Sequence, residues 1–211
     1  MLPTDRYDTS GLPEDQYEPG SEGMVLRNLP GITTRQEMEI AETAALWRAQ
    51  EQLLEEVEQD QSFTAQDIRD IHRLWLGSIY PWAGEYRQVN ISKGGFTFAM
   101  AHTIPVLMEA LEKEQLRRYT PCRFTSRENI TQALAEVHVE LMLIHPFREG
   151  NGRLGRLLAT LMALQSGLPL LDFSDMAGAR KKEYFAAVQA GLDRDYRPMT
   201  RLFSDVIERS S

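Results

Sequence analysis

One segment of the 211-residue chain, between residues 127 and 156, constrains the fold most strongly. Its apolar residues recur at steps of four, three, four and three, which places them on one face of an α-helix; they are Ile130, Leu134, Val137, Leu141 and Ile144. His145-Pro146 should end this helix, because proline disfavours helical backbone in the residue before it. A second apolar run begins at about Arg153, so the sequence predicts two buried helices joined by a short loop.

The same periodicity elsewhere predicts a mainly α-helical fold of about seven helices with one small β-hairpin. The expected helices cover residues 36–61, a stretch starting at Ser62 or Thr64 and ending before Tyr80, and residues 104–117, 127–144, 153–166, 178–191 and 197–209. Residues 86–99 alternate around Gly94-Gly95, which can form a two-residue hairpin turn. The first helix is expected to bury a stripe that includes Met38, Ala45 and Leu54.

Before this helical region, residues 1–35 are predicted to form an irregular N-terminal arm. Residues 1–34 hold four prolines and four glycines and lack sustained periodicity. The tryptophans Trp47, Trp75 and Trp82 are expected in the core and not as ligand-stacking residues.

Composition excludes several classes of protein. The net charge of −8 is not that of a uniformly basic nucleic-acid binder, so no nucleic-acid partner is expected. The single cysteine, Cys122, cannot form an intramolecular disulfide, and no Cys/His cluster has zinc spacing. The N-terminus lacks the apolar region of a secretory signal, and no apolar run approaches the ~20 residues that cross a bilayer. We therefore expect a cytoplasmic protein without a membrane partner.

The loop between the two buried helices carries the chemistry. Gly150-Asn151-Gly152 should lie at a helix N-terminus, where free N–H groups and the helix dipole attract anions. The glycines lack the Cβ atoms that would keep a phosphate from the backbone. Arg153 and Arg156 are three residues apart and share one helix face beside this loop, where guanidinium groups suit phosphate oxygens.

Two further residues flank the same loop. Glu149 is a natural Mg²⁺ ligand, since Mg²⁺ takes one or two carboxylates and completes its shell with phosphate oxygens and water. His145 has an imidazole suited to accepting a proton at neutral pH. A base, a metal ligand, an anion site and two cations together indicate phosphoryl or nucleotidyl transfer.

The run His145-Pro-Phe147-Arg-Glu149-Gly150-Asn151-Gly152-Arg153-Leu-Gly-Arg156 resembles the signature of the Fic (Fido) family, HxFx(D/E)GNGRxxR, at all eight specified positions. The run Asn90-Ile-Ser-Lys93-Gly-Gly-Phe96-Thr-Phe98 also resembles the β-hairpin flap of that family. The resemblance covers about residues 36–205 and implies a Fic-type helical bundle. On this interpretation, residues 36–211 form the catalytic domain and the arm lies outside it.

The resemblance implies a protein AMP-transferase that uses Mg²⁺ and ATP. His145 would be the general base for a Ser, Thr or Tyr hydroxyl of a target protein, and Glu149 would hold Mg²⁺. The phosphates would be bound by Gly150, Asn151, Gly152, Arg153 and Arg156. The target would pair with a flap formed by Lys93, Gly94, Gly95 and Phe96.

Alternatives stay open at this point. Other chemistry of the same family includes UMP, phosphocholine or phosphate transfer and removal of AMP; a non-catalytic nucleotide-binding module is the third hypothesis. Family members often carry an inhibitory (S/T)xxxE(G/N) helix whose glutamate pairs with the second signature arginine, here Arg156. Glu37 and Glu208 follow Thr33 and Ser204 at that spacing, but neither precedes Gly or Asn. An antitoxin-like partner is the alternative regulator.

For each of two further residues near the signature, the sequence allows two roles. His138 is expected to be a satisfied core histidine or a support for the site. Arg148 is expected either to contact phosphate or to face solvent.

Overall fold

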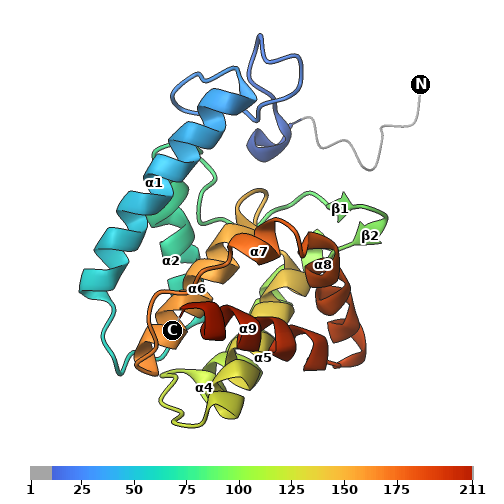
Figure 1. Ribbon diagram of the computed structural model, residues 1–211. Helices are drawn as coiled ribbons and strands as arrows, with labels where there is room; N and C mark the ends of the chain where they lie inside the picture. The colour runs from blue at the N-terminus through green and yellow to red at the C-terminus, as the bar shows by residue number, and fades with distance from the viewer. Residues whose placement is uncertain (1–10, 211) are drawn as a thin grey trace.

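The computed structural model describes residues 11–210; the first ten residues of the predicted arm and residue 211 lie outside this range. The described chain is a helical bundle with one two-stranded antiparallel hairpin (Figure 1). Its helices are α1 (Arg35–Glu56), α2 (Ala65–Leu76), α3 (Ile104–Leu111), α4 (Arg117–Tyr119), α5 (Arg127–Ile144), α6 (Asn151–Gln165), α7 (Ser174–Ala177), α8 (Lys181–Ala190) and α9 (Arg197–Ser210). A π-helical segment, Glu112–Leu116, joins α3 to α4.

The mainly helical fold with one hairpin is confirmed. Each of the seven expected helices is present, and the short α7 is an additional one. The hairpin is shorter than the alternation between residues 86 and 99 predicts, since β1 is Ser92–Lys93 and β2 is Phe96–Thr97. Gly94 and Gly95 form its turn with φ of +59° and +81°, which favours glycine at both positions. The division of the chain into an arm and a domain at residue 36 stays a prediction.

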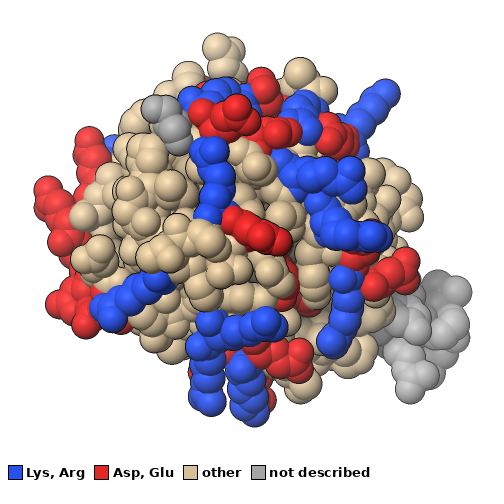
Figure 2. Space-filling model, turned by 60° about the horizontal axis from the view of Figure 1, so that its bottom comes forward, with Lys and Arg blue, Asp and Glu red and all other residues tan. Residues whose placement is uncertain are grey.

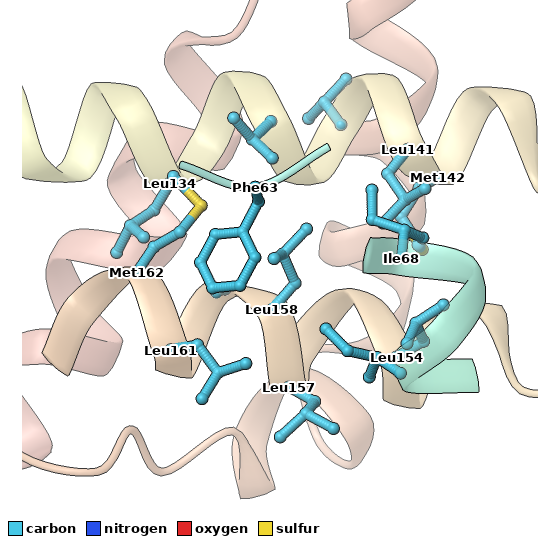
Figure 3. Close-up of a cluster of buried hydrophobic side chains, with 14 of the residues drawn as sticks. Phe63, Ile68, Leu134, Leu141, Met142, Leu154, Leu157, Leu158, Leu161 and Met162 are labelled. Atoms are coloured by element: carbon cyan, nitrogen blue, oxygen red, sulfur yellow. The ribbon is translucent and has the colours of Figure 1, made fainter. Parts of the chain in front are cut away.

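Helix α5 lies at the centre of the bundle and packs against α3, α6, α8 and α9. Figure 3 shows the core between α5 and α6, with Phe63 from the segment before α2 inserted among the leucines of both helices. Phe63 is 1% exposed, and Leu134 and Leu158 beside it are fully buried. This burial fixes α6, and therefore the loop before it, against α5.

Local signals set the start of α2. Thr64 accepts a hydrogen bond from the N–H of Asp67, and the Asp67 carboxylate accepts one from the N–H of Thr64. This capping box selects Thr64 over Ser62 as the N-cap.

The expected buried stripe of α1 is partly wrong. The buried residues of α1 are Met38, Glu42, Ala45, Ala49 and Leu53. Leu54 is 40% exposed and Trp47 is 64% exposed, because α1 packs against the bundle through one face only and both residues lie on its outer side. Trp75 and Trp82 are buried, as expected.

Lys and Arg side chains are interspersed with Asp and Glu on the face of the molecule shown in Figure 2. None of the helices in the described part of the chain has the length and apolarity to span a membrane.

Candidate functional site

A cleft of about 410 Å³ lies where the hairpin, the loop between α5 and α6, and the pair α7–α8 meet. Its volume falls in the range of small-molecule sites. The polar wall consists of His145 and residues 148–153, with Arg156 beyond them. The opposite end is largely apolar and is lined by Met142, Met176, Tyr184, Phe185 and Val188. The signature residues thus lie together on the polar wall, while the apolar end comes mostly from α7 and α8.

His145 stands at the C-terminal end of α5 with φ of +52°, a left-handed conformation that costs a non-glycine residue roughly 1–3 kcal/mol. Two contacts hold it there. The Nε of Arg87 donates a hydrogen bond to the His145 carbonyl at 2.7 Å. The ring of Phe98, just after β2, stacks on the imidazole with 3.8 Å between centroids. The residue that directly follows the hairpin thus contacts the proposed base.

The His145 imidazole is neutral at physiological pH. Burial lowers its pKa to about 4; the backbone carbonyl of Met142 opposes this shift, and the charges of Arg87 and Lys93 add to it. Its Nδ1 is buried and has no hydrogen-bond partner among residues 11–210. A neutral ring can accept a proton, which is the state that a general base requires.

The loop after His145 has the backbone geometry that the predicted anion site requires. Gly150 has φ of +84°, and a Cβ there would lie 2.7 Å from Cζ3 of Trp75, so the position requires glycine. The N–H of Leu154 donates to the Gly150 carbonyl and is the first helical bond of α6. The preceding N–H groups of Asn151, Gly152 and Arg153 have no acceptor within the described residues and can bind an anion.

The side chain of Asn151 closes the loop between α5 and α6. It is buried, its Nδ2 donates to the carbonyl of Phe147 at 2.7 Å, and its Oδ1 accepts from the N–H of Phe147 at 2.9 Å. Both ends of the amide group therefore take part in closing the loop.

Arg153 and Arg156 both line the cleft but differ in their partners. The guanidinium of Arg153 pairs with Glu42 of α1 at 2.6 Å and lies 4.8 Å from the ring centroid of Trp75. Arg156 has no carboxylate partner within the described residues; burial lowers its pKa, the nearby Tyr184 opposes the shift, and Arg153 adds to it. Arg156 is therefore the less neutralised of the two cations.

His72 of α2 supports the loop from behind, a role that no sequence motif indicates. Its Nδ1 accepts the N–H of Gly84 at 2.8 Å, so the proton is on Nε2, which donates to the Glu149 carbonyl at 3.1 Å. The ring stacks on Phe147 with 3.9 Å between centroids. Burial lowers the pKa of His72 to about 4, with Arg73 and Arg153 contributing and the Glu149 carbonyl opposing, so this neutral tautomer is stable at pH 7.

The carboxylate of Glu149 is directed to the cleft and is 45% exposed. Its Oε1 accepts the N–H of Gly150 at 2.9 Å and lies 3.5 Å from Nη2 of Arg153. Within the described residues, no group of three or more His, Cys, Asp or Glu side chains could hold a metal ion alone. One carboxylate beside an anion site fits Mg²⁺, which shares its coordination with phosphate oxygens and water.

The remaining expected site residues lie in different places. Lys93, on β1, lines the cleft with its ammonium 5.7 Å from the Phe185 ring. Phe96 lies on β2 after the glycine turn and packs edge-on against Phe98. Glu37 accepts a hydrogen bond from the Thr34 hydroxyl at the start of α1, and Glu208 is exposed on α9. Neither residue lines the cleft.

His138 and Arg148, for which the sequence allows two roles each, form specific contacts in the structure. His138 is buried, and its Nε2 forms a hydrogen bond with the hydroxyl of Tyr184 at 2.9 Å, so it supports the apolar end of the cleft. Arg148 lines the cleft. Its guanidinium contacts Glu14 and Asp15 of the arm, so the side chain is held by the protein and is not free in solvent.

Comparisons with known proteins identify the family of the domain. The chain contains a Fic/DOC family domain, matched over residues 62–163. A curated protein adenylyltransferase Fic from Culex quinquefasciatus is 29% identical over 159 residues, which are 73% of this chain and 29% of that protein. The chain therefore spans less than a third of the length of this relative.

Solved structures share the fold. The BepC protein of Bartonella tribocorum, a VirB-translocated effector with bound AMPPNP, superposes with a TM-score of 0.71 at 23% identity, covering 87% of this chain and 92% of that chain. The N-terminal Fic domain of a putative cell filamentation protein from Bartonella quintana, with bound ADP, gives 0.69 at 24% identity over 86% and 89% of the two chains.

Proposed function

We propose that this chain transfers AMP from Mg·ATP to a Ser, Thr or Tyr hydroxyl of a target protein. The observation that carries the proposal is the meeting, in one cleft, of a neutral His145, three free N–H groups at the start of α6, and two arginines. A non-catalytic nucleotide binder needs neither a general base such as His145 nor a metal-ligating carboxylate such as Glu149, and both line the cleft. The adenine nucleotides in the two Bartonella structures support a nucleotide as the ligand.

In the proposed reaction, the target hydroxyl gives its proton to the His145 imidazole while its oxygen attacks the α-phosphorus of ATP. The bond from that phosphorus to the bridging oxygen breaks, and pyrophosphate leaves. General-base catalysis of this kind contributes typically about 10²- to 10⁴-fold in rate. The free N–H groups and the two arginines stabilise the phosphate charge, and the apolar end near Met176 and Tyr184 suits a nucleobase. Glu149 would hold Mg²⁺ together with phosphate oxygens, and the bound ion would supply charge neutralisation.

The target is proposed to dock along the hairpin. The residues of β1 are exposed and those of β2 are exposed or half-buried, and the two strands pair only with each other within the described chain. An extended segment can add a strand to such an edge through backbone hydrogen bonds, which need few specific side chains.

For regulation we favour a separate, antitoxin-like partner. Arg156 lacks a carboxylate partner within the described residues, and Glu37 and Glu208 lie outside the cleft. The variants Glu37→Gly and Glu208→Gly test the alternative: increased self-labelling in either one would indicate an inhibitory glutamate in this chain.

The decisive experiment is labelling with α-³²P-ATP. Wild-type protein with Mg²⁺ should label proteins of a cell lysate, and His145→Ala should not, while calorimetry shows that the variant still binds ADP. Equal labelling by the variant would contradict the role of His145. Label from γ-³²P-ATP on protein would indicate phosphate transfer instead.

A further inference from the structure

The N-terminal arm reaches the site through one short helical turn. The 3-10 helix Pro13–Asp15 follows directly on the first described residues, and Glu14 within it is 4% exposed. The arm then doubles back through a bridge between Tyr17 and Leu26, and the N–H of Leu29 donates to the Ile79 carbonyl. The arm is therefore bonded to the body of the protein at both ends of its described part.

The carboxylate of Glu14 is bonded to the root of the hairpin. Its Oε1 accepts the N–H groups of Gln88 and Val89, at 2.6 Å and 3.0 Å, across 74 and 75 residues of sequence. Val89 is 5% exposed and lies three residues before β1. No β-ladder within the described chain satisfies these two N–H groups, so a buried charged acceptor does so instead.

Arg87 connects the same root to the proposed base. Its buried guanidinium donates to the carbonyls of Val89 at 2.6 Å, Ala99 at 2.6 Å and His145 at 2.7 Å, and so joins both ends of the hairpin to the end of α5. Burial lowers the pKa of Arg87 to about 10, and the negative charge of Glu14 opposes that shift. Glu14 thus supports the guanidinium as well as the strand beside it.

The helical turn also contacts the signature loop. The Nε of Arg148 donates to the Glu14 carbonyl at 3.1 Å, and its Nη2 lies 3.6 Å from the Asp15 carboxylate. One turn of the arm therefore bonds to the hairpin root and to the loop that carries the anion site. These two parts of the cleft must keep a fixed distance for a docked segment to present a hydroxyl to His145.

We propose that Glu14 is a positioning residue for the target: it fixes the hairpin root relative to His145, so that a strand added to the hairpin arrives in the reactive register. The hairpin cannot fix itself, because two strands of two residues are not stable alone. This inference rests on the proposed function. It predicts that Glu14 affects transfer to protein and leaves nucleotide binding intact.

Hydrogen exchange tests the bonds directly. In Glu14→Ala, the amides of Gln88 and Val89 should exchange at least about tenfold faster than in the wild type, because they lose their acceptor. Glu18→Ala is the matched control, since the Glu18 carboxylate also accepts a backbone N–H, that of Asn28, but within the arm. Glu14→Gln, which keeps an acceptor oxygen, should restore most of the protection. Unchanged exchange at both amides in Glu14→Ala would overturn the inference.

Activity separates positioning from a general loss of structure. With lysate proteins as acceptor and saturating ATP, labelling by Glu14→Ala should fall about tenfold while ADP affinity stays within about twofold. Glu18→Ala should match the wild type in both. Undiminished labelling, or a parallel loss of ADP affinity, would reject the positioning role. If Glu14→Ala fails to fold, Glu14→Asp, whose shorter side chain withdraws the carboxylate from the N–H groups of Gln88 and Val89, serves in the same assays. A wild-type protein that labels nothing would instead contradict the proposed function itself.

Discussion

The carboxylate of Glu42 in α1 and the guanidinium of Arg153 in α6 form an ion pair across 111 residues of sequence, with 2.6 Å between Oε2 and Nη2. The other carboxylate oxygen accepts a hydrogen bond from the Tyr80 hydroxyl at 2.7 Å, and the Glu42 carbonyl accepts one from the indole N–H of Trp75 at 2.9 Å. Because Trp75 also lies beneath the guanidinium, the orientation of Arg153 is fixed before any ligand arrives.

The resemblance to the Fic family implies that Arg153 binds the β-phosphate, so replacing Glu42 by Gln should weaken binding of nucleotides that carry one. Gln keeps the shape but not the charge, so the Arg153 guanidinium loses its fixed position. We expect ADP affinity to fall about tenfold, or ~1.4 kcal/mol, with AMP affinity unchanged. Calorimetry with both nucleotides provides the measurement. Tyr80→Phe, which leaves the ion pair in place, should have a smaller effect. A gain in ADP affinity would show that Glu42 competes with phosphate instead of positioning Arg153.

Two glycines one turn apart should respond in opposite ways to alanine. A Cβ on Gly152 would meet only Nη1 of Arg156, at 3.5 Å, so Gly152→Ala should keep stability or raise it by up to about 1 kcal/mol. A Cβ on Gly155 would lie 2.7 Å from Cε of Met142 and 3.1 Å from Cε1 of His138, so Gly155→Ala should lose about 1–3 kcal/mol.

ADP binding should separate these two variants further. In Gly152→Ala the new methyl stands at the anion site, so nucleotide binding should weaken in a protein that melts normally. Thermal unfolding and calorimetry on both variants provide the check. Normal ADP affinity in Gly152→Ala would mean that the start of α6 does not approach the phosphates.

The features predictable from sequence are those fixed by neighbours in the chain. The end of α5 at His145-Pro146 and the turn at Gly94-Gly95 depend on local backbone preferences, and the structure has both. Helix α6 begins at Asn151, two residues before the start that the apolar pattern predicts at about Arg153. The strand expected from residue 86 onward was too long, because Val89 is buried by core contacts and its N–H bonds to Glu14, not to a partner strand. The alternation of apolar and polar residues before β1 therefore reflects burial of side chains and not hydrogen bonding to a partner strand.

The contacts that support the site come from distant segments and could not be predicted. Glu42, His72, Arg87 and Glu14 all act on the site through bonds to residues more than fifty positions away. Glu42 alone left a signal, since it is a carboxylate on the same helix face as Met38, Ala45 and Leu53. A charged residue in a buried stripe requires a partner, but the sequence does not say which one.

Stability should fall on mild acidification because three histidines are buried and neutral. Burial lowers the pKa of His72, His138 and His145 to about 4 each, whereas an unfolded histidine titrates near 6.5. Between these values the unfolded chain binds protons that the folded chain does not. The free energy of unfolding should therefore decrease as pH falls from 6.5 toward 4, by up to about 1.4 kcal/mol per pH unit for each ring.

Urea unfolding at pH 7.5, 6.5 and 5.5 measures this dependence. His138→Gln, which keeps an amide near the Tyr184 hydroxyl, should reduce the slope. A stability that does not change across this range, or a slope unaffected by His138→Gln, would contradict the buried neutral state of these rings.

Removing the carboxylate of Glu149 should change the magnesium requirement without changing the fold. The side chain is 45% exposed, and the loop conformation depends on Asn151 and His72, so Glu149→Gln should melt like the wild type. A neutral amide is a weaker Mg²⁺ ligand than a carboxylate, so we expect the Mg²⁺ concentration for half-maximal labelling to rise about tenfold. Glu109→Gln is the control, since Glu109 pairs with Lys113 on the surface of α3 and does not line the cleft.

EDTA should abolish labelling by both variants and by the wild type. The same magnesium curve for Glu149→Gln and the wild type would assign the metal to another ligand, and labelling that persists in EDTA would remove magnesium from the reaction.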